Sequence, residues 1–316
     1  MQQEQTGGIA PQDGIVQAHG LNLHYRQWQP EMGAGLVPPA SRRPGAGGAA
    51  PATVPPILLV HGLASAAAIW NLTAPLLAER GHRVVAVDQR GHGESDKPDH
   101  GYSFEEIAAD DHALVETLGL ARPVLVGHSW GGSIVLQYAA TYPEEVHALV
   151  LVDGGFTQMS GRAGWTKEQM LKNLAPPQFA GTPAETFLSF GRRGALGQVW
   201  SPAIEDALLH IVEVRPDGTV APRLSLANHL QILEAMWDQP TLALYDRVTC
   251  PILIVCPTQE GGDERARQFQ AAKRESIEQL QTRKPGIRVE YLPDTIHDVP
   301  FQRPAVLAGL IEQMAR

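Results

Sequence analysis

One short segment combines residue types that nucleophilic catalysis uses, because Val124 to Ser133 reads VLVGHSWGGS. Apolar residues run into Gly127, Ser129 stands two places later, and two further glycines precede a segment with the pattern of a helix. A serine hydroxyl is a poor nucleophile at neutral pH, so a neighbouring base must take its proton during attack. Ser129 is therefore a candidate nucleophile, whereas Ser133 falls inside the following helix.

Six apolar, β-rich runs surround this serine and predict a mostly parallel sheet. Such continuous runs are typical of strands that are buried on both faces of a parallel sheet. The runs are PILLV (56–60), RVVAV (83–87), PVLV (123–126), ALVLV (148–152), PILIVC (251–256) and IRVEYL (287–292). Helix-like segments at 69–80, 104–119 and 133–142 alternate with them, which indicates an α/β fold with a doubly wound sheet. Alternating apolar residues at 14–29 predict an antiparallel hairpin before this sheet.

The pattern of strands also divides the chain. It stops over residues 155–240, which predicts a helical cap inserted into a core made of residues 14–154 and 241–316. The aromatic and methionine side chains of this cap either line an apolar pocket or form the cap's own core. Residues 1–13 are expected to form an N-terminal tail. Residues 30–55 are dominated by Pro, Gly and Ala, which predicts a long mobile loop.

Candidate site residues gather where the predicted strands end. In an open α/β sheet, ligands bind beyond the carboxyl ends of the strands. The segments at these ends are HGLAS (61–65), DQRGHGESD (88–96), GHSWGG (127–132), PTQEGGD (257–263) and PDTIHDVP (293–300). A serine, several carboxylates and a histidine therefore occur in that order, each at a strand end.

These motifs together resemble the α/β-hydrolase superfamily, and the resemblance covers nearly the whole chain from Gly14 to Arg316. The segment GHSWG (127–131) matches the G-x-S-x-G nucleophile elbow of that superfamily, a sharp turn from a strand into a helix. The resemblance implies the α/β-hydrolase fold, with the N-terminal hairpin and a helical cap insertion. It also implies that Ser129 is the nucleophile.

The resemblance further assigns the base and the oxyanion hole. His297 is the histidine in the loop after the last predicted strand, where the superfamily places its base. The backbone N–H groups of Leu63 and Trp130 occupy the positions that hold the oxyanion in this superfamily.

The acid that orients the base is open among three carboxylates. The superfamily usually carries it after the strand before the last, with the pattern strand, Gly, two residues, Asp. Aligning PILIVCPTQE on that strand places Pro257 at the glycine and Glu260 at the aspartate, so Glu260 is expected first. Asp263 lies three residues further along the same loop, and Asp153 ends the strand that a minority of the superfamily uses. Asp298, adjacent to the histidine, would point the wrong way.

The resemblance implies a serine hydrolase that cleaves a carboxylic ester, a lactone or a thioester of a small to medium apolar substrate through an acyl-enzyme. Epoxide hydrolases and haloalkane dehalogenases carry an aspartate at the elbow, so Ser129 argues against both. A carbon–carbon bond hydrolase, a haloperoxidase-like enzyme and a non-catalytic ligand receptor of the same fold are the alternatives.

Composition restricts the partners and cofactors of this 316-residue chain. Its formal charge of −9 argues against nucleic acid and anionic membranes as partners. The sequence lacks an H-E-x-x-H motif, a paired-cysteine motif and a G-x-G-x-x-G motif, so no metal or cofactor is expected. Cys250 and Cys256 bracket one apolar run, and an extended strand separates them by about 20 Å, too far for a disulfide. We expect a cytoplasmic protein, because no signal peptide or long apolar span is visible. We also expect a monomer or homodimer that acts on a small molecule.

Overall fold

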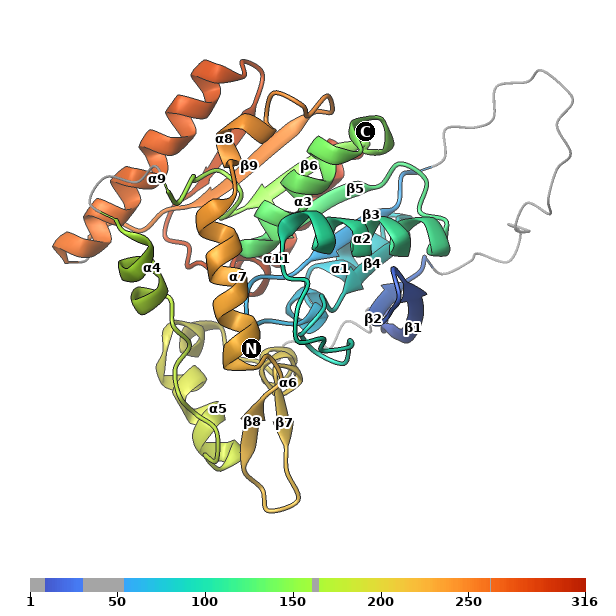
Figure 1. The fold of residues 1–316 in the computed structure, drawn as a ribbon. Coiled ribbons are helices and arrows are strands. Elements are labelled where there is room, and N and C mark those ends of the chain that lie inside the picture. The colour runs from blue at the N-terminus through green and yellow to red at the C-terminus, as the bar shows by residue number, and fades with distance from the viewer. Residues whose placement is uncertain (1–8, 31–53, 161–164, 262) are drawn as a thin grey trace, which may run out of the picture.

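An eight-stranded, mostly parallel sheet forms the centre of the molecule (Figure 1). The computed structural model describes residues 9–30, 54–160, 165–261 and 263–316. The strand order is β1-β2-β4-β3-β5-β6-β9-β10. The strands are β1 (Gln12–Ala18), β2 (Leu21–Trp28), β3 (Ile57–Val60), β4 (Val84–Val87), β5 (Val124–His128), β6 (Ala148–Val152), β9 (Ile252–Pro257) and β10 (Arg288–Leu292). All six runs that were predicted as strands of a mostly parallel sheet are strands of this sheet.

The direction and burial of the strands follow the sequence pattern with one exception. β1 and β2 form the predicted antiparallel hairpin, β2 also pairs antiparallel with β4, and the strands from β4 to β10 are parallel neighbours. β3, β4, β5, β6 and β9 are buried along their whole length. The expectation that β10 is equally buried is wrong, because β10 lies at the edge of the sheet and only its last residue, Leu292, is buried.

Helices cover both faces of the sheet, and alternate strand residues supply the two cores. Leu58 and Val60 of β3 face one core, whereas Ile57 and Leu59 face the other. The first core is covered by α2 (Phe104–Leu118), α3 (Trp130–Thr141) and α9 (Glu264–Arg283), and the second by η1 (Ala67–Trp70), α1 (Ala74–Ala78), α10 (Val299–Gln302) and α11 (Pro304–Met314). The single helix predicted at 69–80 is instead divided into η1 and α1. The helix predicted at 133–142 begins earlier, at Trp130, directly after Ser129.

Between β6 and β9 the chain forms an insertion that is mostly helical. Its elements are α4 (Lys167–Asn173), α5 (Ala184–Arg193), η3 (Ala195–Val199), α6 (Pro202–His210), β7 (Val212–Val214), β8 (Val220–Pro222), α7 (Leu226–Asp238) and α8 (Thr241–Leu244). In Figure 1, α5, α6 and the β7–β8 hairpin extend below the sheet. Arg223 pairs with Glu94 at 2.5 Å, and Arg26 pairs with Asp206 at 3.3 Å. These two ion pairs tie the insertion to the loop after β4 and to β2.

The two cysteines, Cys250 and Cys256, are both free thiols, as the sequence predicts. Within the described ranges, no group of three or more His, Cys, Asp or Glu side chains is arranged to hold a metal ion. No helix in the same ranges combines the length and the apolar character needed to cross a membrane. The loop predicted at 30–55, apart from its ends, and the first eight residues of the tail predicted at 1–13 lie outside the described residues.

Candidate active site

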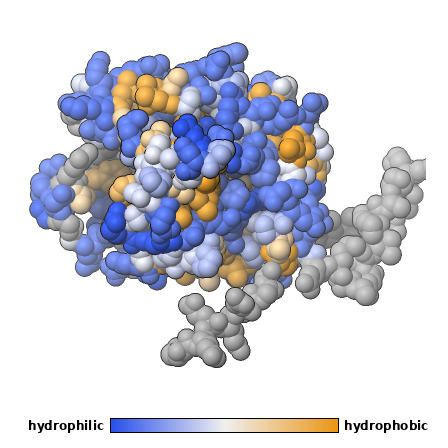
Figure 2. Space-filling model, turned by 90° about the horizontal axis from the view of Figure 1, so that it is seen from below, coloured by the Kyte–Doolittle hydropathy of each residue, from blue (hydrophilic) through white to orange (hydrophobic). Residues whose placement is uncertain are grey.

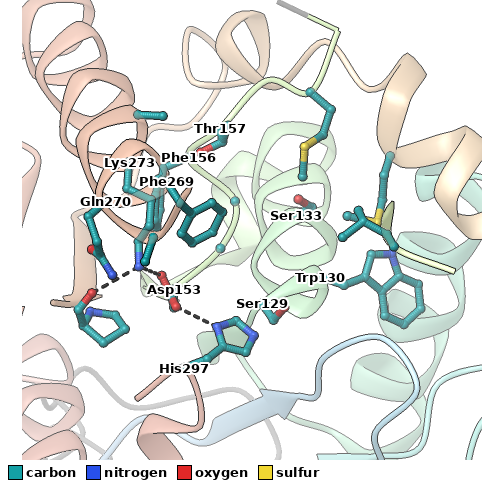
Figure 3. A pocket seen from close by; sticks show the side chains of 18 of the residues that line it. Ser129, Trp130, Ser133, Asp153, Phe156, Thr157, Phe269, Gln270, Lys273 and His297 are labelled. Atoms are coloured by element: carbon teal, nitrogen blue, oxygen red, sulfur yellow. Dashed lines mark hydrogen bonds and ion pairs between the residues drawn. The ribbon is translucent and has the colours of Figure 1, made fainter. Parts of the chain in front are cut away.

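Ser129 occupies the turn between β5 and α3, where a strand leads directly into a helix. Its backbone angles are φ 55° and ψ −120°, and a positive φ is uncommon for a residue other than glycine. The Ser129 N–H donates to the Val152 carbonyl at 2.8 Å, and the Gly132 N–H donates to the Ser129 carbonyl at 2.9 Å. These bonds hold a strained turn, and such strain is typical of functional sites. Ser129 thereby lines a cavity beyond the sheet (Figure 3).

Gly127 and Gly131 allow the strand and the helix to approach each other at this turn. A Cβ atom on Gly127 would lie 2.2 Å from the carbonyl oxygen of Gly131. A Cβ atom on Gly131 would lie 2.5 Å from the carbonyl oxygens of Val60 and His61. Because these neighbours are backbone atoms, no side-chain rotation relieves the overlap. Both glycines of the elbow are therefore required by sterics.

Gly131→Ala is expected to lower the free energy of unfolding by about 1–3 kcal/mol, because the added methyl group forces α3 away from β3. Gly309→Ala in α11 is the matched control, since nothing lies within 4 Å of its Cβ position. That variant should gain roughly 0.5–1 kcal/mol, because alanine is the better helix former. Urea denaturation of both variants and the wild type measures these differences. Equal stability of the two variants would contradict the steric explanation.

His297 lies in the loop between β10 and α10, and its imidazole meets the Asp153 carboxylate (Figure 3). His297 Nδ1 lies 2.6 Å from Asp153 Oδ2. The loop is held by His128, whose Nε2–H donates to the His297 carbonyl at 2.9 Å. Burial lowers the pKa of His297, but the hydrogen bond to Asp153 and the charges of Asp153 and Asp298 outweigh it, so the pKa is raised from 6.5.

The bond to Asp153 decides which nitrogen of His297 can act as a base. Because Nδ1 donates to Asp153, Nε2 is the nitrogen that remains to take a proton. Figure 3 shows the Ser129 side chain beside the imidazole, away from Asp153. Burial would raise the pKa of Asp153, but His297 and Lys273 together lower it, so this carboxylate stays ionised. A hydroxyl, an imidazole and a carboxylate in this order are the groups that serine hydrolysis uses as nucleophile, base and orienting acid.

The carboxylate expected first, Glu260, does not meet His297, and this prediction is corrected. Glu260 is exposed in the loop after β9. Glu260 lines an adjoining cavity of about 410 Å³ together with Gln259 and Asp294, and neither Ser129 nor His297 lines that cavity. The alignment of the β9 end therefore places Glu260 in the right loop but away from the imidazole.

Asp263, the second carboxylate of that loop, caps a helix instead. Its Oδ1 accepts a hydrogen bond from the Ala266 N–H at 2.8 Å, at the start of α9. Asp153, the alternative at the end of β6, is the carboxylate that contacts His297. Asp153 follows β6, the strand directly beside β5, whereas the loop after β9 carries Glu260 to the surface and uses Asp263 to cap α9.

Lys273 completes this group, and no motif of the sequence indicates its position there. Its Nζ lies 2.6 Å from Asp153 Oδ1 and donates to the Pro257 carbonyl at 3.1 Å. The side chain is 7% exposed, so the ion pair is buried. A lysine in a helix rich in charged residues is ordinarily solvent-facing, and Asp153 lies far away in the sequence, so no local signal marks this contact.

The two candidate oxyanion donors belong to segments that flank Ser129. Trp130 is the first residue of α3, where N–H groups have no partner within the helix. Leu63 belongs to the loop after β3. A Cβ atom on Gly62 would lie 3.1 Å from Ser129 Cβ, so this loop passes directly beside Ser129. Donors from these two segments would meet the carbonyl oxygen of a substrate that Ser129 attacks.

Two buried histidines hold the loop that carries Leu63. His61 Nδ1 donates to the Gly62 carbonyl at 2.7 Å, and its Nε2 accepts from a backbone N–H at 3.0 Å. His92 Nε2 accepts from the Ala64 N–H at 3.2 Å, and its Nδ1 donates to a backbone carbonyl at 3.0 Å. Burial lowers the pKa of both side chains, to about 3 for His92. Both imidazoles therefore stay neutral, as an accepting nitrogen requires.

The cavity beside Ser129 has a volume of about 470 Å³ and a largely apolar wall. Its apolar side chains include Phe156, Met159, Trp165, Leu174, Met236 and Phe269. Phe179 and Phe187 instead pack against each other in a core of the insertion, so each of the two expectations for the aromatic residues holds for some of them. Figure 2 shows hydrophobic patches on a mostly hydrophilic surface, one of them in a hollow at the left, the side on which α4 and α9 lie in Figure 1.

The amino-acid sequence is similar to those of known proteins over part of their length. Residues 55–193 match the family model for the alpha/beta hydrolase fold. A stretch of 104 residues is 38% identical to bifunctional epoxide hydrolase 2 of Sus scrofa, covering 32% of this chain and 19% of that protein. A stretch of 139 residues is 33% identical to the non-heme chloroperoxidase of Streptomyces lividans, covering 44% of this chain and 43% of that protein. The matches thus span less than half of either relative.

The structure is similar to solved structures over nearly its whole length. The crystal structure of E-2-(acetamidomethylene)succinate hydrolase superposes with a TM-score of 0.72, covering 96% of this chain and 99% of that one. The two sequences are 22% identical. At this identity the likeness concerns the fold.

Proposed function

Because the chain belongs to the α/β-hydrolase superfamily, we propose that it is a serine hydrolase that cleaves a carboxylic ester, a lactone or a thioester through an acyl-enzyme. One observation carries the proposal: Ser129, His297 and Asp153 line the same cavity, and the imidazole is already bonded to the carboxylate. This is the constellation that activates a serine for attack on an acyl carbon.

The proposed reaction uses the chain's own groups and water. Ser129 Oγ attacks the acyl carbonyl while His297 Nε2 removes its proton, and Asp153 stabilises the resulting imidazolium. The N–H groups of Leu63 and Trp130 donate to the oxyanion. His297 then protonates the leaving group, and a water molecule activated by the same imidazole hydrolyses the acyl-enzyme.

A serine at the elbow separates this proposal from epoxide opening, which one of the relatives performs according to its name. Enzymes that form an alkyl-enzyme ester need a carboxylate nucleophile, and position 129 carries a hydroxyl. A hydroxyl is suited to acyl transfer, because the acyl-enzyme it forms is itself an ester that water can cleave.

The cavity wall supports an apolar acyl group of small to medium size as the substrate class. A volume of about 470 Å³ lies in the range of small-molecule sites, and apolar side chains dominate its wall. Ser129 and His297 are among the polar residues of the wall, so an acyl group bound in the cavity would have its carbonyl near the proposed nucleophile and base.

Hydrolysis of p-nitrophenyl esters from acetate to decanoate tests the proposal. We expect kcat/KM to rise about fourfold for each CH₂ group that enters the cavity, because burying one contributes about 0.8 kcal/mol. The rise should stop once the acyl chain exceeds the cavity. Activity limited to acetate would contradict the apolar acyl site. No turnover with any ester would overturn ester hydrolysis and favour a carbon–carbon bond hydrolase, a haloperoxidase-like enzyme or a receptor.

A further inference from the structure

We propose that Lys273 is a positioning residue of the catalytic machinery, which holds the Asp153 carboxylate against His297 and balances its charge. The inference rests on the proposed function, and it adds a residue of helix α9 to the site. It also explains how an acid at the end of β6 is kept in place.

The geometry fixes the Asp153 carboxylate from two sides (Figure 3). Asp153 Oδ2 lies 2.6 Å from His297 Nδ1, and Oδ1 lies 2.6 Å from Lys273 Nζ. Lys273 is itself anchored, because Nζ also donates to the Pro257 carbonyl at the end of β9 at 3.1 Å. The Asp153 and Lys273 side chains are 6% and 7% exposed. A carboxylate bonded through both oxygens inside the protein has one orientation, and that orientation faces His297.

The backbone around Asp153 explains why such an anchor is needed. Asp153 has a φ of 49°, and a Cβ atom on the next residue, Gly154, would lie 1.9 Å from the Ser129 carbonyl oxygen. Asp153 therefore belongs to a turn with an uncommon backbone conformation, and the backbone of this turn packs directly against that of Ser129. Lys273 supplies a positive charge to a carboxylate that burial removes from water, and an unpaired buried charge is costly.

Lys273 also affects the charge around His297. The groups that face His297 are Asp153 from β6, Lys273 from α9, Asp298 from its own loop, and His128 from β5. His128 is neutral, because burial lowers its pKa to about 3. Asp153 and Asp298 raise the pKa of His297, and Lys273 opposes them. The positive charge of Lys273 thus limits the rise in the pKa of His297 that the two carboxylates cause.

Among the residues that the structure describes, Asp153 is the carboxylate that forms an ion pair with Lys273. Asp153 faces its Nζ, the Cys256 thiol of β9 lies nearby, and the Phe269 ring lies 5.6 Å away. Burial raises the pKa of Cys256 to about 11, so the thiol is neutral at physiological pH. The positive charge of Lys273 therefore interacts mainly with the Asp153 carboxylate.

Lys273→Met and Lys273→Arg test the proposal. Met keeps most of the apolar stem and removes the charge, whereas Arg keeps a positive charge. We expect the Met variant to lose about 10- to 100-fold in kcat at pH 7, because the acid is no longer held in its reactive position. We also expect the acidic limb of its kcat/KM profile to move to higher pH. The Arg variant should recover part of the rate and return the limb toward that of the wild type.

The control is Lys284→Met. Lys284 directly follows α9, and its Nζ donates to the Val248 carbonyl at 2.8 Å, so this variant loses a lysine bond to a backbone carbonyl away from the site. Its kcat and pH profile should match the wild type. If Lys273→Met kept the wild-type rate, or lost rate with an unmoved acidic limb, the proposed role would be overturned and a purely structural one would remain.

A second measurement separates this inference from the proposed function. NMR titration of the His297 imidazole needs no substrate, so it reports on the Lys273 charge even if no ester is turned over. The imidazole should titrate at higher pH in Lys273→Met than in the wild type. An unchanged titration would overturn the inference while leaving ester hydrolysis by Ser129 intact. If the Met variant does not fold, Lys273→Gln is titrated in its place, with the same outcomes.

Discussion

Ser129→Ala is expected to lower kcat for p-nitrophenyl ester hydrolysis by at least about 10⁴-fold, because the proposed reaction begins with its hydroxyl. The variant should keep the wild-type melting temperature, since alanine and serine differ little in their tolerance of the positive φ at the elbow. Steady-state kinetics and thermal unfolding measure the two quantities. A reactive p-nitrophenyl phosphonate provides a third, because it should add one phosphonyl group to the wild type and none to Ser129→Ala.

Ser133→Ala is the control for that result. Ser133 lies one helical turn away on α3 and lines the same cavity, but the elbow does not present it. Its loss should cost at most about tenfold, as expected for a contact that only shapes the site. A Ser129→Ala variant with wild-type turnover would show that the hydroxyl is not the nucleophile.

The positions of Ser129 and His297 could be predicted because each depends on local sequence or on chain order. The elbow needs two glycines within five residues, which the sequence shows directly. The atoms that leave no room for a side chain at position 131 are the carbonyl oxygens of Val60 and His61. The alternation of strands and helices places His297 after the last strand, and the resemblance to the superfamily assigns that position to the base.

The partner of His297 could not be predicted in the same way. Several strand ends meet at one edge of the sheet, so Asp153, Glu260 and Asp263 all stand close to the site in the topology. Which carboxylate faces the imidazole depends on the neighbours of each strand and on the path of the loop after β9. Lys273 is harder still to find, because its role depends on how α9 packs rather than on any pattern along the helix.

The cap illustrates a related limit. Aromatic and methionine side chains at helical spacing have the same pattern whether they face a cavity or each other. Phe187 packs inside the insertion and Met236 lines the cavity, yet both come from amphipathic helices. The direction of each side chain is set by tertiary packing, so the size of the substrate site could not be derived from the sequence.

Asp153→Asn is expected to lower kcat by about 10⁴-fold, because an amide supports the wrong tautomer of His297 and cannot stabilise an imidazolium. Glu260→Gln is the matched comparison, since it makes the same chemical change at the acid that the alignment favours. Glu260 is exposed and lines the other cavity, so its loss should change kcat by about twofold at most. Measuring kcat of both variants on one ester decides which carboxylate orients His297. A large loss of kcat in Glu260→Gln alone would reject Asp153 as that acid.

Loss of rate in Asp153→Asn has a competing explanation, because the substitution also leaves Lys273 buried without its anionic partner. Breaking a buried ion pair from one side costs about 3–5 kcal/mol of stability, and a poorly folded enzyme would be slow for that reason alone. The double variant Asp153→Asn with Lys273→Met separates the two causes, since it removes the unpaired charge. Its melting temperature should recover toward that of the wild type while its kcat stays low. Recovery of both would mean that Asp153 acts on the fold rather than on His297.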